Sequence, residues 1–208
     1  MIQLLENRWV FPLAVAVTGV VVIIAGVLAY DEFMARPAVG ATVSPPDTGD
    51  TVRTALRPAS RVAARWRTDA ELTGALIHIE GAEGTGDAPE WTFQFFSPSS
   101  GSVGLISAGR AEASLLHESR APYALPTFAS ETWSVDSDEA LGIWWRQGGG
   151  YLVTRRPDSE ITMRLGLADE GRGGPVWVVS GSVPGQQSAF SVTVDATDGS
   201  IIEPLETE

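Results

Sequence analysis

The sequence predicts an α+β protein: a single N-terminal transmembrane helix followed by a soluble domain of two halves, each a helix packed on an antiparallel sheet. Three observations predict this arrangement. Residues 10–29 carry no charged side chain, and a helix of this length would span the roughly 30 Å of a bilayer hydrocarbon core. Farther along, a stretch with helical periodicity is followed by short strand-like runs separated by Gly- and Pro-containing turns. The same order of elements then recurs, which indicates two similar halves.

The N-terminal region divides into a short flank at 1–8, the expected transmembrane helix at 9–30 and a linker at 31–50. Trp9 and Tyr30 border the apolar run, and aromatic rings favour the headgroup level of a bilayer. A secretory signal peptide is the alternative, but its apolar stretch is about 7–15 residues long, so the longer run favours a retained signal-anchor. Basic residues on the two flanks are nearly balanced and do not set the orientation. The small residues that would let this helix pack closely against other membrane helices are Ala16, Gly19, Ala25 and Gly26.

Composition excludes several classes of protein. The 208 residues include no cysteine, which excludes disulfides, thiolate metal sites and cysteine nucleophiles. The formal net charge is −12, made up of −3 over residues 1–50, +5 over residues 51–67 and −14 over residues 68–208. Because phosphate neutralisation dominates the affinity of proteins for nucleic acid, so acidic a domain is not expected to bind DNA or RNA.

The first half is predicted at 51–132. Its helix covers Val52 to Arg67, where one face repeats apolar residues every three or four positions: Val52, Leu56, Ala59, Ala63 and Trp66. Three strand-like runs follow, at 75–80, 91–96 and 102–107. The connecting stretch at 114–132 is too apolar for a free tether, so we expect it to lie in a groove between the halves.

The second half is predicted at 133–208. Asp136 and Glu139 fit a capping box, in which the Asp136 carboxylate accepts from the amide three residues on and Glu139 reaches back. The helix that starts there should end at Gly148–Gly150, because glycine adopts the left-handed conformation that closes helices. Four strand-like runs follow, at 160–167, 176–180, 190–194 and 200–202.

The closing strands of the second half resemble a known family. A Pro-x-Trp strand at Pro175–Val179 is followed by Ser191–Ile201, which ends in the pattern Asp-Ala-x-x-Gly-x-Ile, and both are similar to the end of a PepSY-type domain. Val135–Leu141 is similar to the helix start of the same unit. The resemblance covers residues 133–203, and it covers 52–113 only through the order of elements and a tryptophan-led strand. It implies two PepSY/cystatin-like halves outside the cytoplasm, acting as binding or regulatory modules without catalytic residues that could be transferred to this chain.

The sequence contains no recognisable catalytic or metal-binding pattern. His78 and His117 are its two histidines, and it has no nucleophile elbow, His-Glu-x-x-His motif or phosphate-binding loop. The Asp195–Gly199 segment is typical of a turn after a strand, because it lacks the oxygen ligands of a calcium loop. We therefore expect a protein that is not an enzyme, with no cofactor and no bound metal.

Two features are candidates for contact with a partner. Four arginines recur every four residues along one side of the first predicted helix: Arg53, Arg57, Arg61 and Arg65. Like charges at this spacing are mildly unfavourable, so acidic side chains of the domain, anionic lipid headgroups or a partner should compensate them. Trp144 and Trp145 are adjacent in the second predicted helix, where neighbouring side chains point about 100° apart. One ring should therefore lie in the core and the other should be available as a contact residue.

These observations predict a non-catalytic interaction module, anchored in the cell membrane by one span, with its soluble domain on the periplasmic or extracellular side. An accessory or stabilising subunit of a larger membrane complex fits best. Its partners would be other membrane-protein subunits, with anionic lipid as a further partner. The alternative is a free-standing PepSY-type regulator of a peptidase or of cell-envelope sensing.

Overall fold

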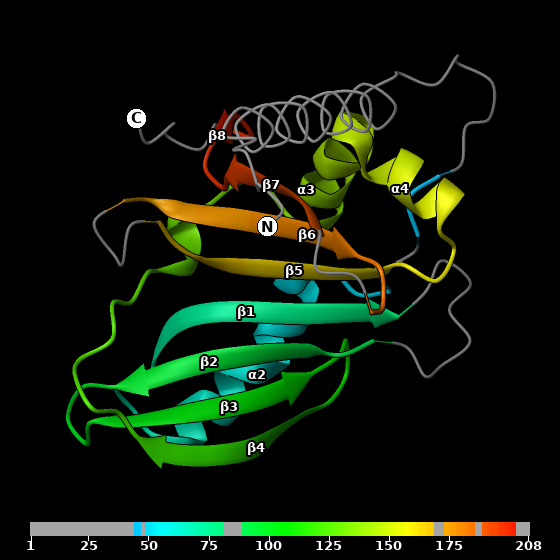
Figure 1. Ribbon diagram of the computed structural model, residues 1–208. Coiled ribbons are helices and arrows are strands. Elements are labelled where there is room, and N and C mark those ends of the chain that lie inside the picture. Colours follow the sequence, from blue (N-terminus) through cyan, green and yellow to red (C-terminus); the bar gives the residue numbers. More distant parts are fainter. Residues whose placement is uncertain (1–43, 47–48, 81–88, 169–172, 186–188, 203–208) are drawn as a thin grey trace, which may run out of the picture. The chain divides into compact units, whose positions relative to one another are not determined.

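The domain is built on one antiparallel sheet of eight strands, in the order β4-β3-β2-β1-β5-β6-β7-β8 (Figure 1). Every neighbouring pair of strands is antiparallel. The first four strands are β1 (Glu71–Glu80), β2 (Trp91–Ser97), β3 (Ser102–Ala108) and β4 (Ala113–Arg120). The last four are β5 (Glu160–Leu167), β6 (Pro175–Ser182), β7 (Ala189–Asp195) and β8 (Ile201–Ile202).

The computed structural model describes residues 44–46, 49–80, 89–168, 173–185 and 189–202. The described residues belong to one compact unit. The expected transmembrane helix at 9–30 lies outside the described residues, as do its flank at 1–8, most of the linker at 31–50 and the packing candidates Ala16, Gly19, Ala25 and Gly26. Within the described ranges, no helix is long and apolar enough to cross a bilayer.

The continuous sheet corrects the prediction of two separate helix-on-sheet halves. β1 pairs with β5 through six register partners, from Ala75–Leu165 to Glu80–Glu160. The first strands of the two predicted halves therefore form the middle of one sheet. The sequence could not reveal this pairing, because each strand shows only its own alternation between buried and exposed positions.

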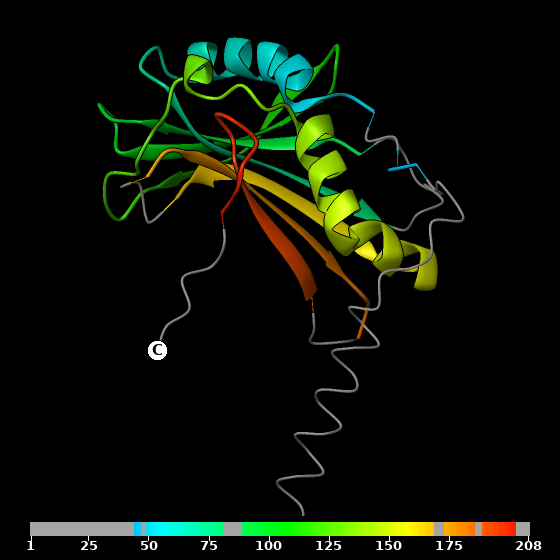
Figure 2. The same ribbon diagram turned by 90° about the horizontal axis from the view of Figure 1, so that it is seen from above.

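The helices cover one face of the sheet. α2 (Val52–Trp66) and α3 (Ser137–Trp144) both lie on this face (Figure 2). α4 (Gly150–Arg155) continues α3 after a π-type turn at Trp145–Gly149, and a 3-10 turn, Ser130–Thr132, precedes α3. The opposite face carries none of the described helices. The core therefore lies between the helices and the sheet, where the buried strand residues include Ile77, Ile106, Met163 and Val179.

The two halves repeat with the same register. Each consists of a helical segment followed by four antiparallel strands, and the first strands of the two repeats are neighbours in the sheet. Trp91 of β2 pairs with Ala108 of β3, and 86 residues later Trp177 of β6 pairs with Val194 of β7. Ile77 of β1 pairs with Met163 of β5 at the same offset, and these strands are antiparallel. The inner strands of the halves are therefore related by an approximate twofold axis between β1 and β5.

The tryptophans at these equivalent positions hold the helices over the sheet. Trp91 and Trp177 are fully buried and contact each other edge to face, with ring centroids 6.0 Å apart. Trp91 Nε1 donates to the carbonyl oxygen of Asp50 at 2.8 Å, and Trp177 Nε1 donates to that of Val135 at 2.9 Å. Each acceptor lies just before the helix of its own half. Because a buried indole N–H needs an acceptor, the two bonds fix where each helix begins above the sheet.

Both helices begin close to their predicted positions. α2 covers Val52–Trp66, one residue shorter than predicted. α3 begins after Asp136 as predicted, but the capping-box bond is wrong. Asp136 Oδ1 accepts from the backbone N–H of Ser137 at 2.8 Å and from that of Arg53 at 3.4 Å. The second donor is 83 residues away in the chain, so a local motif could not have revealed it.

The predicted end of the second helix at Gly148–Gly150 is also wrong. Gly148 has a φ of 138°, a conformation that favours glycine, but the chain bends there and continues into α4. A Cβ atom on Gly150 would lie 2.6 Å from Trp145 Nε1, and one on Gly149 would overlap the Trp144 ring. The glycines therefore let the helix turn closely around two indole rings.

β4 is the strand that the sequence pattern does not predict. Nearly every residue of Ala113–Arg120 is exposed, so the strand lacks a buried face to give alternation. Its pairing with β3 also contains a register shift. The remainder of the apolar stretch crosses back toward β1, where Phe128 is buried and its N–H donates to the Leu72 carbonyl at 2.9 Å. The stretch therefore packs on the domain, but the expected position in a groove between the halves is wrong for its first part, because β4 is the outer edge strand.

We expect Trp177→Ala to lower the free energy of unfolding by about 3–5 kcal/mol, because it removes a buried ring and leaves the Val135 carbonyl without its donor. Urea unfolding of a protein comprising residues 43–208 measures the change. Leu76→Ala is the matched control in the same sheet. Leu76 is 41% exposed, so its truncation should cost clearly less, about 1–1.5 kcal/mol. Equal effects of the two substitutions would contradict a stabilising role for the buried tryptophan.

Candidate functional site

The outer face of α2 carries the four arginines that the sequence singled out. α2 contains no acidic residue, and its inner face packs small apolar side chains against the sheet. The helical period therefore directs the arginines away from the core. All four are exposed: Arg53, Arg57, Arg61 and Arg65.

Arg53 differs from the other three because it holds the two helices together. Its Nη2 donates to the Trp133 carbonyl oxygen at 2.5 Å, and its guanidinium lies 4.5 Å from the centre of the Trp133 ring. Its backbone N–H donates to Asp136, the residue that caps α3. These contacts join the first turn of α2 to the start of the second half, so Arg53 has a structural role.

Arg57, Arg61 and Arg65, which we call the arginine row, have no such contacts. In the part of the chain that the structure describes, none of the three side chains takes part in an ion pair, a hydrogen bond or a ring contact. Each pair of neighbours is four residues apart on the helix, a spacing at which like charges repel by a few tenths of a kcal/mol. Among the described residues, therefore, no acidic side chain pairs with this row.

The second half shows that the fold does not require an arginine row. Its equivalent helical segment, α3 with the following turn and α4, presents acids, amides and hydroxyls as well as arginines. The exposed residues of this segment are Asp138, Glu139, Arg146, Gln147, Thr154 and Arg155. The two repeats therefore carry different charges on their equivalent helical segments.

The two candidate tryptophans have different environments. Trp144 is fully buried, and its Nε1 donates to the Phe190 carbonyl oxygen at 3.2 Å. Trp145 is half-buried, and its ring contacts the Trp144 ring edge to face at 6.3 Å. Of the pair, Trp144 belongs to the core, and Trp145 is the partly exposed member.

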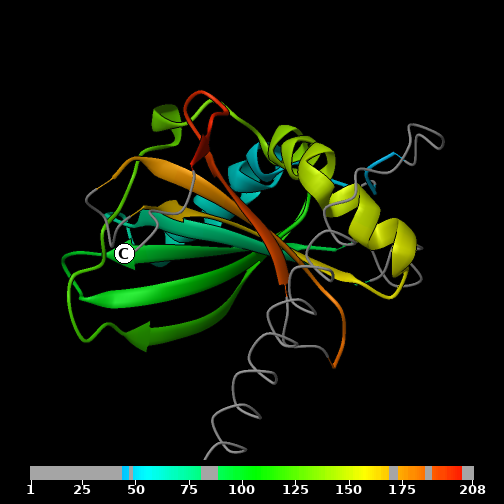
Figure 3. The ribbon, with the colours of Figure 1, turned by 45° about the horizontal axis from the view of Figure 1, so that its top comes forward.

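The arginine row and the two tryptophans lie on different helical segments. α2 and α3 meet at their first turns, where the Val52 N–H donates to Ser137 Oγ at 3.0 Å. From there the helices diverge across the sheet (Figure 3). Trp145 follows the last residue of α3, whereas the arginine row continues along α2. The arginine row and Trp145 therefore lie on diverging helical segments, and each stays a separate candidate for contact with a partner.

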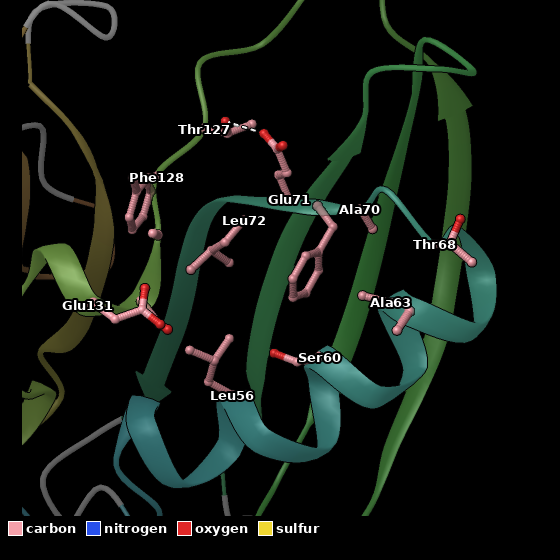
Figure 4. A pocket seen from close by; sticks show the side chains of 14 residues that line it. Leu56, Ser60, Ala63, Thr68, Ala70, Glu71, Leu72, Thr127, Phe128 and Glu131 are labelled. Carbon is pink, nitrogen blue, oxygen red and sulfur yellow. Dashed lines mark hydrogen bonds between the residues drawn. The ribbon is translucent and has the colours of Figure 1, made fainter.

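A pocket of about 510 Å³ opens beside α2. It lies between the second half of α2, the start of β1 and the segment at 127–131 (Figure 4). Its apolar lining includes Leu56, Ala63, Leu72, Phe95 and Phe128. Its polar lining consists of Ser60, Thr68, Glu71, Thr127, Ser130 and Glu131. The lining contains two carboxylates and no basic side chain, so an uncharged or cationic apolar group would fit it.

Hydrogen bonds shape this pocket from two sides. Thr127 Oγ1 donates to Glu71 Oε2 at 2.6 Å, which joins the crossing segment to β1. Nearby, hydrogen bonds from Ser99 and from Ser97 hold the Asp69 carboxylate and lower its pKa to about 2. Asp69 therefore stays ionised and fixes the α2–β1 connection against the β2–β3 turn. Sequence reasoning missed the pocket because its lining comes from separate segments.

The two histidines lie outside this pocket. His78 is half-exposed on β1, with Nδ1 3.1 Å from Thr162 Oγ1 and Nε2 3.7 Å from Glu160 Oε2. His117 is exposed on the edge strand β4. Among the described residues, no group of three or more histidine or acidic side chains is arranged to hold a metal ion.

Comparison with known proteins does not identify a family. No protein-family model matches the sequence, and no curated protein matches it. Among solved structures, a "putative lipoprotein (CD1622)" from Clostridium difficile 630 is similar, with a TM-score of 0.45 and 9% sequence identity. The match covers 77% of this chain and 97% of the other. A likeness of this size carries no argument about function, and the resemblance to PepSY-type domains is not confirmed.

We expect Arg53→Ala to lower the free energy of unfolding by about 1–2 kcal/mol, because it removes the bond to the Trp133 carbonyl and the contact with the indole ring. Arg61→Ala is the matched control: it removes the same charge from the same helix. That change should stay within about 0.5 kcal/mol, because Arg61 has no described partner. Urea unfolding of residues 43–208 measures both. Equal losses would contradict the structural role of Arg53.

Proposed function

We propose that the protein is a non-catalytic, membrane-tethered interaction module that serves as an accessory subunit of a larger membrane complex. The arginine row is the observation that carries the role of an interaction module, and the charge-free run at 10–29 carries the membrane tether. Three exposed guanidinium groups lie along one helix without a described partner, although the fold does not require them. Exposed arginines that repel one another suit a surface that meets an anionic partner.

The positions of the residues that could act as a general base or a nucleophile favour a binding role over a catalytic one. His78 and Thr162 lie half-exposed on the sheet face opposite the helices. The pocket lies on the other face and is lined by neither histidine. A general base and a nucleophile would need to converge on a shared substrate position, and we propose no catalytic role for either residue.

The charge-free run at 10–29 supports a single membrane span, because its length matches the hydrocarbon core of a bilayer. In this proposal, small side chains let the span approach helices of the other subunits closely. These residues are Ala16, Gly19, Ala25 and Gly26. The similarity of residues 133–203 to PepSY-type domains supports a domain on the periplasmic or extracellular side. The linker at 31–50 would connect the two parts.

We expect the full chain to co-purify from membranes in mild detergent as a stoichiometric assembly with other membrane proteins. Gly19→Leu combined with Gly26→Leu should reduce recovery of the partners severalfold, because bulky side chains prevent close approach of helices. Val20→Leu combined with Val27→Leu is the matched control and should retain them. Recovery of the chain alone, or with a peptidase only, would contradict an accessory subunit and favour a free-standing regulator.

We expect protease added to intact spheroplasts to digest the domain, because we place it on the outer side of the membrane. Immunoblotting with an antibody against the domain follows the loss. A cytoplasmic protein in the same sample should survive until detergent is added. Survival of the domain together with that marker would overturn the proposed orientation.

A further inference from the structure

We propose that the arginine row docks on anionic phospholipid headgroups, so that the outer face of α2 lies against the bilayer that holds the chain. This inference rests on the membrane span of the proposed function, and it names the partner of the row. Protein contacts within the complex would then be made elsewhere on the chain. The occupant of this helix face is a lipid surface.

Charge complementarity is the first argument. The row contributes three positive charges from a helix without an acidic residue, whereas residues 68–208 carry a net charge of −14. Near an anionic surface, the acidic remainder is repelled and the row is attracted. These opposed forces orient the domain with α2 toward the membrane.

The second argument is the composition of the surface between the arginines. Ser60 and Ala64 are the other exposed residues along this part of α2. The large apolar side chains that the domain exposes lie on other elements and include Leu76, Leu115, Leu116 and Tyr123. The centre of a protein interface usually contains apolar or aromatic anchors. Phosphate headgroups need only the charge and paired N–H donors that arginine supplies. The surface therefore suits headgroups better than a protein.

The third argument is the position of α2 in the sequence. Val52, its first residue, follows the charge-free run at 10–29 after the short stretch 30–51. At about 3.3–3.6 Å per residue, this stretch reaches at most about 80 Å. A tether of this length keeps the row near the bilayer at a high effective concentration, so weak contacts with several headgroups suffice.

The absence of cysteine in the chain makes a direct test possible. Two single-cysteine versions of the full chain, Ala64→Cys on α2 and Ser114→Cys on β4, are labelled with a donor dye and reconstituted into vesicles. Ser114 pairs with Ser107, which lies between the buried core residues Ile106 and Ala108, and so points away from the helices. The vesicles contain phosphatidylcholine alone or mixed with phosphatidylglycerol, with an acceptor dye on a headgroup.

With phosphatidylglycerol present, energy transfer from position 64 should exceed that from position 114. The difference should disappear in phosphatidylcholine alone. It should also weaken between about 0.1 M and about 1 M salt, where the Debye length falls from about 10 Å to about 3 Å. Replacing Arg57, Arg61 and Arg65 by glutamate should lower the ratio of docked to undocked domains on the order of a hundredfold.

The control replaces three exposed arginines elsewhere, Arg110, Arg120 and Arg146, by glutamate. It changes the net charge equally and should retain most of the difference in energy transfer. Equal loss in both variants would overturn the inference, because net charge alone would then explain binding. Thermal unfolding of each variant verifies that the domain remains folded.

Failure of the inference is distinguishable from failure of the proposed function. A chain that does not float with vesicles after alkaline washing contradicts the membrane span and both proposals. A chain that floats, but shows the same energy transfer with and without phosphatidylglycerol, overturns lipid docking alone. Loss of a protein partner on reversing the row, without lipid dependence, would assign the row to that protein instead.

Discussion

The pairing of β1 with β5 is the contact on which the rest of the domain depends. Ile77 faces Met163 at its centre, and both side chains are buried. Separated from β5, β1 would be a ten-residue edge strand with an unpaired row of backbone groups and buried isoleucines beside it. The contact between Trp91 and Trp177 crosses the same junction within the core. The two repeats therefore share one sheet and one hydrophobic core, and this shared core sets the positions of both helices.

Local pattern predicted the elements that have one buried and one exposed face. β5 has its predicted bounds because Ile161, Met163 and Leu165 alternate with less buried neighbours. β1 begins earlier than predicted, because a register shift between Leu72 and Gly74 interrupts its alternation. β4 has no buried face from which to predict it. The continuity of the sheet depends on strands far apart in sequence, and the sequence of one strand does not identify the strand with which it pairs.

In the candidate site, too, local spacing predicted some features, whereas others depend on partners far apart in the sequence. Spacing alone predicted a row of exposed arginines on α2, and these side chains are exposed. Spacing could not separate Arg53 from the others, because its partner Trp133 is 80 residues away. The burial of Trp144 likewise depends on Phe190, 46 residues away. The pocket could not be predicted for the same reason, since Phe128 and Leu56 come to line one cavity only in the folded chain.

The common register of the repeats has a thermodynamic consequence. The backbone hydrogen bonds that join β1 to β5 are of the same kind as those within either half, so the sheet has no weaker boundary at its centre. A protein of two separate domains can lose one and keep the other folded. Here we expect one cooperative melting transition. A destabilising substitution in either repeat would then lower the stability of both, because neither has a folded state of its own.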